Sequence, residues 1–369
     1  MIFSKRIVLL IFFSAVSRLL YAQKSTDDCE ETLNLAATEF NSGRFYNIAK
    51  ILQPCLQNGF SREQRQRANL LLTQVNLLQD DPVGAENSYL DLLRANPEFV
   101  ADTARDPIDV VYLSRKFTAD PVISAFVRLG GNTSPVRVIH QINPSGEINI
   151  TNNYSLQPGL LLGGGFDINI RSELALSVEL NYATTAYTKK QVKFNLDEKI
   201  FTDRQHWLTL PIAVKYTDTK GIVRPYGYAG FALQWLISDN GQIDWTKNDI
   251  NPIEGQPPIS NFIPSPSIDF MEFRNKFNYS VFVGGGVRYK IGLDFLFADL
   301  RYSFGMTNLV IPTTTYSSAG PMVEYGHTDD YFRLDNLAIS VGYVKPFYKP
   351  RKLKTARTRT ILKGLSKGA

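Results

Sequence analysis

The spacing of hydrophobic residues along the chain changes once, near residue 120. Over residues 30–98 the apolar positions recur every three or four residues, which predicts amphipathic helices. From residue 121 onward apolar and polar residues alternate strictly, which predicts β-strands with one apolar and one polar face. We therefore expect a multidomain α + β protein, with a helical domain first and an antiparallel β-structure after it.

The helical part contains two helix pairs separated by turn residues. In "ETLNLAATEFNSGRFYNIAKILQPCL" the polar residues 41–43 predict a turn between two helices. The second pair is "QRANLLLTQVNLL" and "GAENSYLDLLRANPEF", with a break at residues 80–82. Residues 106–117 are expected to close the array as a further helix. These helices make up a predicted domain over residues 24–118.

The helix pairs resemble tetratricopeptide repeats, in which small and aromatic residues pack one helix against the next. The residues that match this packing pattern are Ala37, Phe40, Gly43, Phe45, Ala49, Ala85, Tyr89, Leu92 and Pro97. The usual tryptophan is absent, so the domain is described as tetratricopeptide-like. The resemblance implies a surface that binds a protein partner, and a spacer is the alternative.

The chain has two cysteines, Cys29 and Cys55, at the start of the first predicted helix and the end of the second. A helical hairpin brings these two ends together, and an oxidising compartment favours a disulfide between them. Two thiols and three scattered histidines do not form a metal-binding set, so neither a metal nor another cofactor is expected.

Eight segments after residue 120 alternate at period two and are long enough to cross a bilayer as tilted strands. They are 122–131, 158–170, 173–187, 206–218, 222–236, 278–291, 293–308 and 332–348. An even strand number, alternating faces and aromatic residues near strand ends are typical of an outer-membrane β-barrel, predicted here over residues 120–349.

The connections between these segments alternate between short turns and long polar stretches. The long stretches are 134–156, 188–205, 238–275 and 309–330. Barrels of this class have short periplasmic turns and long outer loops. This alternation of short and long connections predicts that the helical domain and the end of the chain lie in the periplasm.

The polar faces of the strands carry charged residues of both signs. The predicted interior charges are Arg128, Asp167, Glu179, Lys215, Arg224, Arg288, Asp299 and Arg301. An eight-stranded barrel is just wide enough for side chains to fill, and unpaired buried charges are costly. We expect these residues to pair with one another, which argues against a transport pore.

Two glycine runs, "LLLGGGFDINI" and "VFVGGGVRYKI", could be mistaken for phosphate-binding loops. Neither has the third glycine of a dinucleotide fingerprint nor the Lys-Ser/Thr of a P-loop. Both continue the strand alternation through the glycines. We expect the inward glycines to make room for long side chains in a narrow barrel.

The two ends of the chain have their own composition. Residues 1–22 have a basic start, an apolar run and a plausible cleavage neighbourhood, which predicts a secretory signal peptide. Residues 350–369 form a basic tail, also expected in the periplasm. The formal net charge is +5, but the segment between leader and tail is mildly acidic. Nucleic-acid binding therefore has no support outside the tail.

Three strands carry a further resemblance. "RSELALSVELNY", "HWLTLPIAVKY" and "GIVRPYGYAGFAL" resemble consecutive strands of the PorT-like, eight-stranded outer-membrane barrels of Bacteroidota. The resemblance extends over about residues 120–348. It implies a role near type IX secretion or gliding components, a family whose members differ in function.

Together these features predict a non-enzymatic barrel in outer-membrane lipid that anchors a periplasmic protein-docking module, as an envelope-assembly or secretion-accessory scaffold. Two alternatives remain open. One is a lipid-modifying enzyme that uses His206 with Thr209, or His140 or His327. The other is a barrel that recognises a surface ligand through the outer loop 238–275.

Overall fold

The computed structural model describes residues 28–142, 150–193, 197–249, 259–314 and 325–353. The chain divides into two compact units, the first made of Met1–Pro121 with Tyr348–Ala369 and the second of Val122–Phe347. The predicted order, helices before an antiparallel ring of strands, is confirmed. The predicted signal peptide, residues 1–22, lies outside the described residues.

The first unit is a stack of helices. They are a helix over residues 28–41, α2 (Ile48–Gln57), α3 (Arg62–Leu78), α4 (Pro82–Ala95) and α5 (Ile108–Ser114). A capping box at Ser61 and Gln64 starts α3, and Asp81 caps the proline-initiated start of α4. The helices enclose two apolar clusters, one around Ile48 and Leu52 and one around Tyr89.

The end of the chain also belongs to the first unit. β14 (Arg351–Lys352) pairs antiparallel with β1 (Phe117–Thr118), and the Leu353 amide donates to the Lys116 carbonyl at 2.7 Å. Lys352 Nζ contacts the Glu86 carboxylate on α4 at 2.6 Å. Residues 350–353 are therefore part of the helical unit and not of a separate tail; residues 354–369 lie outside the described part of the chain.

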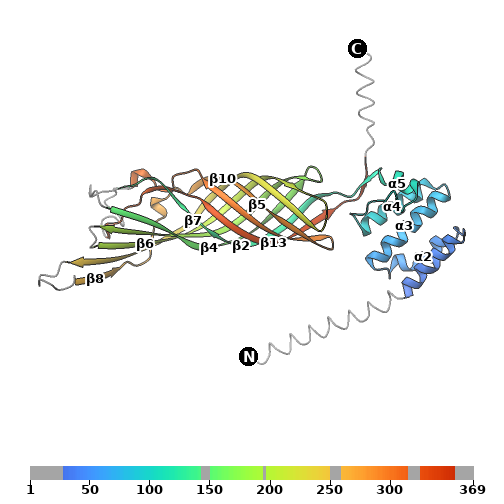
Figure 1. The fold of residues 1–369 in the computed structure, drawn as a ribbon, viewed down its shortest axis with the longest axis horizontal. Helices are drawn as coiled ribbons and strands as arrows, with labels where there is room; N and C mark the ends of the chain where they lie inside the picture. Colours follow the sequence, from blue (N-terminus) through green and yellow to red (C-terminus); the bar gives the residue numbers. More distant parts are fainter. Residues whose placement is uncertain (1–27, 143–149, 194–196, 250–258, 315–324, 354–369) are drawn as a thin grey trace, which may run out of the picture. The chain divides into compact units, whose positions relative to one another are not determined.

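The second unit is a closed ring of eight antiparallel strands (Figure 1). In chain order these are β2 (Pro121–Thr133), β4 (Ile150–Asn169), β5 (Leu174–Lys193), β6 (Asp197–Thr217), β7 (Val223–Asp249), β10 (Phe277–Ile291), β11 (Asp294–Gly305) and β13 (Asn336–Tyr348). Each strand pairs with its neighbours in the ring, and the pairing of β7 with β10 contributes to closure. Closure satisfies the backbone of every strand within the lipid.

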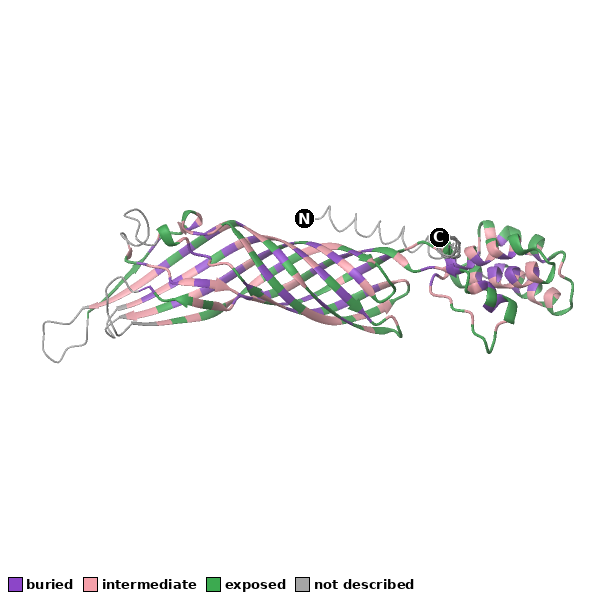
Figure 2. Cartoon of the chain, turned by 90° about the horizontal axis from the view of Figure 1, so that it is seen from above, coloured by how far each residue is buried: buried purple, intermediate pink, exposed green. Residues whose placement is uncertain are grey.

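The alternation in the sequence becomes an inside and an outside of the ring, visible as buried and exposed bands along each strand in Figure 2. Large apolar side chains cover the outside, among them Val127, Leu129, Leu160, Leu162, Leu180, Val214, Phe231, Val283, Leu300, Ile339 and Val341. The strand segments that carry this apolar band are the membrane-spanning segments. Within the described ranges, no helix is both long and apolar enough to span a bilayer.

The strands extend further than the sequence predicted. β5 and β6 pair with each other as far as Lys193↔Asp197, so residues 188–193 and 197–205, expected as part of a loop, are paired strands. β7 continues to Asp249 and pairs with β8 (Ile259–Pro264) and β9 (Ile268–Asp269). Cross-strand pairing sustains these polar segments beyond the apolar band, which is why a pattern of apolar residues did not reveal them.

Shorter elements complete this end of the barrel. β3 (Val136–His140) pairs with β12 (Tyr331–Leu334), and two 3-10 helices cover Met271–Phe273 and Pro312–Thr314. The ladders shift register between Gln157 and Leu161 and between His206 and Trp207. Such bulges increase local twist. The barrel contains two apolar cores, an inner core around Phe282 and a second core around Phe332.

Candidate functional site

The lumen within the membrane-spanning segments is crossed by ion pairs. Arg301 on β11 donates from Nη1 and Nη2 to the Glu179 carboxylate on β5, at 2.9 and 2.8 Å. β5 and β11 lie opposite one another in the ring order. Arg128 on β2 lies between them, 3.4 Å from Glu179 and 3.3 Å from Asp299. All four side chains are buried.

A second set lies closer to the short turns. Asp167 on β4 accepts from Lys215 on β6 at 2.8 Å and from Arg288 on β10 at 2.7 Å. β4 and β10 are also opposite strands of the ring. Arg224 is half-buried, with its guanidinium carbon 4.8 Å from the centre of the Phe295 ring. All eight predicted interior charges thus face the lumen, and seven of them belong to these two ion-pair sets.

The glycine runs border these ion pairs. A Cβ added at Gly284 would lie 2.5 Å from the Tyr228 ring, and one at Gly163 would lie 1.9 Å from Asn181 Oδ1. Tyr228 OH in turn donates to Asp299 at 3.2 Å. The inward glycines therefore leave the space that long polar side chains occupy, as expected for glycines that continue a strand.

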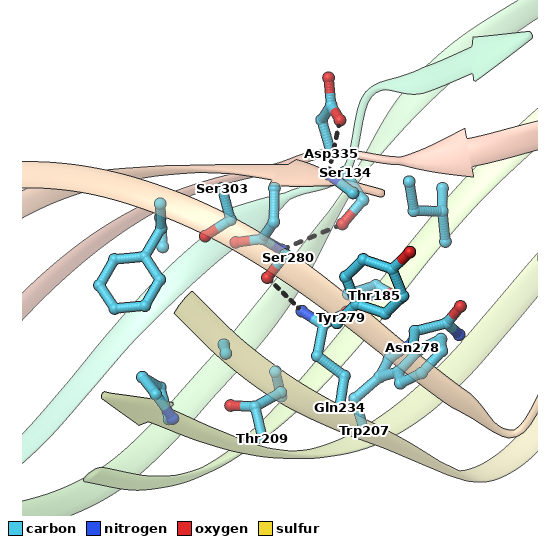
Figure 3. A pocket seen from close by; sticks show the side chains of 18 of the residues that line it. Ser134, Thr185, Trp207, Thr209, Gln234, Asn278, Tyr279, Ser280, Ser303 and Asp335 are labelled. Atoms are coloured by element: carbon cyan, nitrogen blue, oxygen red, sulfur yellow. Dashed lines mark hydrogen bonds between the residues drawn. The ribbon is translucent and has the colours of Figure 1, made fainter. Parts of the chain in front are cut away.

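Beyond the ion pairs lies a polar chamber of about 80 Å³. Figure 3 shows its wall, where Gln234 donates to Ser280 at 3.2 Å. The side-chain oxygens of Asn181, Thr185 and Asn278 are buried without a hydrogen-bond partner in the described part of the chain. A chamber of this size holds a few water molecules, which such oxygens would bind.

The second core, beyond the membrane-spanning segments, is organised around Arg274. This side chain is fully buried and donates to three aspartates: Asp239 at 2.8 Å, Asp203 at 3.3 Å and Asp329 at 2.6 Å. The rings of Phe270 and Phe332 flank its guanidinium at 5.3 and 5.8 Å. A parallel contact joins buried Lys189 to Asp330 at 3.0 Å.

The aspartates around Arg274 differ in their proton affinity. Burial raises the pKa of Asp203 well above its usual range, and the neighbouring Asp239 carboxylate adds to the rise. Burial opposes ionisation of Asp329 as well, but the charge of Arg274 lowers its pKa below the usual range. Burial lowers the pKa of His327, which contacts Asp329 at 3.1 Å. The cluster therefore combines an ionised aspartate with one that retains its proton at higher pH.

The three histidines have different surroundings. His206 lies on the outer face of β6 and its Nδ1 is 2.6 Å from the Tyr182 hydroxyl, whereas Thr209 lines the chamber inside. His327 is buried against Phe201, and His140 lies beside Tyr331 on the β3–β12 sheet. The structure does not bring His206 and Thr209 together. The described residues also contain no group of three or more metal-ligating side chains.

In the helical unit the Cys29–Cys55 disulfide is present, with a Cα–Cα distance of 5.7 Å. Of the tetratricopeptide-like positions, Ala85, Tyr89, Leu92 and Pro97 are buried, and Phe40 meets Phe45 edge to face at 5.4 Å. Gly43 occupies a turn with φ +75°, and Ala37 is half-buried. The expected packing role is wrong at one of these positions.

The packing role expected for Ala49 is wrong, because this residue is exposed. The buried face of α2 follows Ile48, Leu52 and Cys55, a spacing of four and three residues. Ala49 is about 100° around the helix from Ile48 and points away from the core.

A groove of about 610 Å³ lies in the helical unit, between the end of α2, the first half of α3 and the second half of α4. Arg62, Arg65 and Asn69 line it from α3, above the apolar residues Phe60 and Leu72. The sequence analysis missed this groove. The signal available was the spacing of positions 62, 65, 69 and 72, which places them on one face of a helix.

Comparison with known proteins identifies a family for this chain. Residues 123–310 match the family described as outer membrane protein beta-barrel domain. Similar solved structures include the outer membrane protein OprG from Pseudomonas aeruginosa (11% identity, 63% of this chain and 99% of that chain, TM-score 0.36). Others are Neisserial surface protein A (13%, 60% and 97%, 0.30) and the outer membrane protein AlkL (12%, 64% and 94%, 0.31). No curated protein sequence matches the chain.

The matched segment is a little over half of the 369 residues and contains six of the eight ring strands in full, namely β4, β5, β6, β7, β10 and β11. Its strands carry the apolar outer band and the charged lumen described above. The expectation of an outer-membrane β-barrel is thereby confirmed, and the chain belongs to the outer membrane protein beta-barrel domain family.

Proposed function

We propose that this protein is a closed, non-enzymatic outer-membrane anchor that holds a helical protein-docking module in the periplasm. In this role it is an envelope-assembly or secretion-accessory scaffold. The observation that carries the proposal is the pairing of β14 with β1. It builds the helical unit from chain segments that precede the first barrel strand and follow the last one.

The lumen supports an anchor rather than a channel. The Arg301–Glu179 and Arg288–Asp167 pairs each join opposite strands, and the second core around Arg274 fills the ring beyond them. The chamber between the two levels has a volume suited to a few waters.

Connectivity supports a periplasmic helical unit. The three short turns, residues 170–173, 218–222 and 292–293, lie at the same end of the barrel as the start of β2 and the end of β13. In outer-membrane barrels the short turns face the periplasm. Both links to the helical unit leave from this end, and this connectivity favours a periplasmic location for the unit.

Exposed apolar side chains support a docking role for the helical unit. Tyr46 is 90% exposed, Val100 83% and Val83 67%, and Ile108 and Tyr112 are each 59% exposed. These side chains are candidate contacts with a partner, because burial of exposed apolar surface favours association.

Photocrosslinking in living cells tests this function. A photoreactive residue at Tyr46 or Tyr112 is expected to capture a protein partner, whereas one at Lys220, in a short barrel turn, serves as the control for contacts made by any periplasmic position. Externally added protease should cleave the helical unit only after the outer membrane is permeabilised. Cleavage in intact cells, or equal crosslinking from all three positions, would contradict the proposal.

One observation favours recognition of a surface ligand as a second function. All six residues of β8 are exposed, including Ile259 and Phe262, and this strand pairs only with β7 among the described residues. An exposed strand edge can add a strand from another chain. Proteolytic removal of this hairpin from intact cells should abolish surface binding while leaving the periplasmic crosslinks intact.

A further inference from the structure

The groove between α3 and α4 is lined by both cationic and apolar side chains. Its floor is apolar, with Phe60 7% and Leu72 8% exposed. Arg62 and Arg65 stand on the same face of α3, one turn apart, and both are exposed. The groove therefore has a cationic rim over an apolar floor.

The rim cations are available to a ligand. Arg62 donates from Nε to the Ala95 carbonyl at 2.6 Å, which fixes its guanidinium at the end of α4. Within the described ranges no carboxylate pairs with Arg62 or Arg65. The third arginine of the groove, Arg94, contacts Asp91 at 2.6 Å. Arginine presents a planar fork that matches a carboxylate in two hydrogen bonds.

Asn69 provides a second, independent observation. This side chain is 4% exposed and lines the groove between the arginines and Leu72. Its side-chain amide has no hydrogen-bond partner among the described residues, while its backbone carbonyl accepts from the Thr73 hydroxyl. Its amide atoms remain accessible to solvent, and an amide can both donate to and accept from a peptide backbone.

We propose that this groove binds an acidic, partly apolar peptide segment of a protein partner. The arginines would hold its carboxylates, Asn69 its main chain and the floor its aliphatic side chains. This inference rests on the proposed docking function and specifies its ligand. The chain's own end does not complement the groove, because residues 354–369 contain five basic residues and no acid.

A binding titration on the full-length protein in detergent tests the proposal. The probe is a short fluorescein-labelled peptide that alternates Glu and Leu, followed by fluorescence anisotropy. Saturable binding that weakens with added salt is expected. Arg65→Gln should weaken it about tenfold, since a lost charge-assisted hydrogen bond is worth ~1.4 kcal/mol or more. Asn69→Asp should weaken it by a similar factor, since it removes the amide donor and places a negative charge beside the peptide's carboxylates.

The control is Arg44→Gln, which removes the same charge from an exposed arginine that contacts Glu39 outside the groove. This variant should bind the peptide as the native protein does, and a peptide with Gln in place of Glu should not bind. Equal loss with Arg44→Gln, or equal binding of the Gln peptide, would overturn the proposal. So would displacement of the peptide by short-chain phosphatidylglycerol at lower concentration, since it would assign the groove to a lipid headgroup.

Failure of this inference is distinguishable from failure of the docking function. If crosslinks form at Tyr46 or Tyr112 but the acidic peptide does not bind, the helical unit docks a partner and the assignment of the groove is wrong. If the peptide binds and Arg65→Gln also removes the crosslinks in cells, the groove is the docking site.

Discussion

Arg301 on β11 and Glu179 on β5 meet across the full width of the barrel, through hydrogen bonds of 2.9 and 2.8 Å between opposite strands of the ring. Pairing between opposite strands closes the lumen, which pairing between neighbours would not do. A buried ion pair is weak support for stability in itself, but a charge left alone in such a site is strongly destabilising. The pair is therefore best tested by removing one partner and then both.

Glu179→Leu should lower the free energy of unfolding of the barrel by about 3–5 kcal/mol, because it leaves the arginines with one carboxylate. Adding Arg301→Met should recover much of this loss, since Arg128 and Asp299 remain as a neutral pair 3.3 Å apart. Urea unfolding of the detergent-solubilised protein measures both. Lys190→Met, at an exposed pair with Glu198, is the control and should cost under about 1 kcal/mol. A double variant less stable than the single one would contradict this account.

In planar bilayers the native protein should show no stepwise ion conductance. Replacing Arg301, Glu179, Arg288 and Asp167 together by alanine should leave it closed, because the core around Arg274 fills the lumen at a second level. Stable channels formed by the native protein would contradict the proposal that the barrel is a closed anchor. Channels from the variant alone would mean that the second core does not seal the ring.

The glycine run of β10 offers a comparison between adjacent residues. A Cβ at Gly286 would lie 2.2 Å from the Ala298 carbonyl oxygen, whereas the nearest atom to a Cβ at Gly285 is at 3.2 Å. Gly286→Ala should destabilise the barrel by about 1–3 kcal/mol through overpacking, and Gly285→Ala should cost clearly less. Urea unfolding of both variants tests this. Equal costs would show that the inward position has no special role.

The sequence predicted the membrane-spanning barrel well because one physical rule governs it. Lipid outside and a narrow polar lumen inside impose period two on every strand, so the inward placement of Arg128 or Asp299 follows from counting. Which charges meet does not follow from periodicity, because the Arg301–Glu179 contact depends on the closed ring order.

The remaining features lacked such a rule. Arg274 lies between a 3-10 helix and β10, where no repeating pattern exists, and its aspartates come from three other segments. β14 is two residues long and carries no strand pattern. The packing role predicted for Ala49 was wrong because the sequence does not show which of two neighbouring apolar positions lies at the centre of a helix face.

The Cys29–Cys55 disulfide gives a prediction for the helical unit. Its sequence separation is 26, and closing a loop of this length stabilises by about 3 kcal/mol on the chain-entropy account. Cys29→Ser, Cys55→Ser and the double variant should lose helical circular dichroism at the same lower temperature, since each breaks the same bridge. The barrel's unfolding transition serves as the internal control and should not move. A single variant that is much less stable than the double would point to a harmful free thiol instead.

The cluster around Arg274 predicts two opposing effects of pH on the stability of the barrel. Asp203, whose pKa is raised by burial, stabilises the fold in its protonated form, and this contribution falls as the pH rises from about 4 through the raised pKa. Burial opposes ionisation of Asp329, but the charge of Arg274 lowers its pKa below the usual range. Ionised Asp329 therefore stabilises the fold above a pH of about 4, and this stabilisation is lost as the pH falls through the lowered pKa. Replacing either aspartate by asparagine removes only the pH effect of that residue.

Asp203→Asn should therefore flatten the decline of barrel stability with rising pH, because an amide is a permanent analogue of the protonated carboxyl and can still accept from Gln205 and Arg274. Asp329→Asn should lower the free energy of unfolding at neutral pH by about 3 kcal/mol, since it removes the 2.6 Å ion pair with Arg274. Urea unfolding from roughly pH 5 to pH 8 measures both. If Asp203→Asn proves the more damaging variant at neutral pH, Asp203 is ionised there and the assignment of the proton in this cluster is reversed.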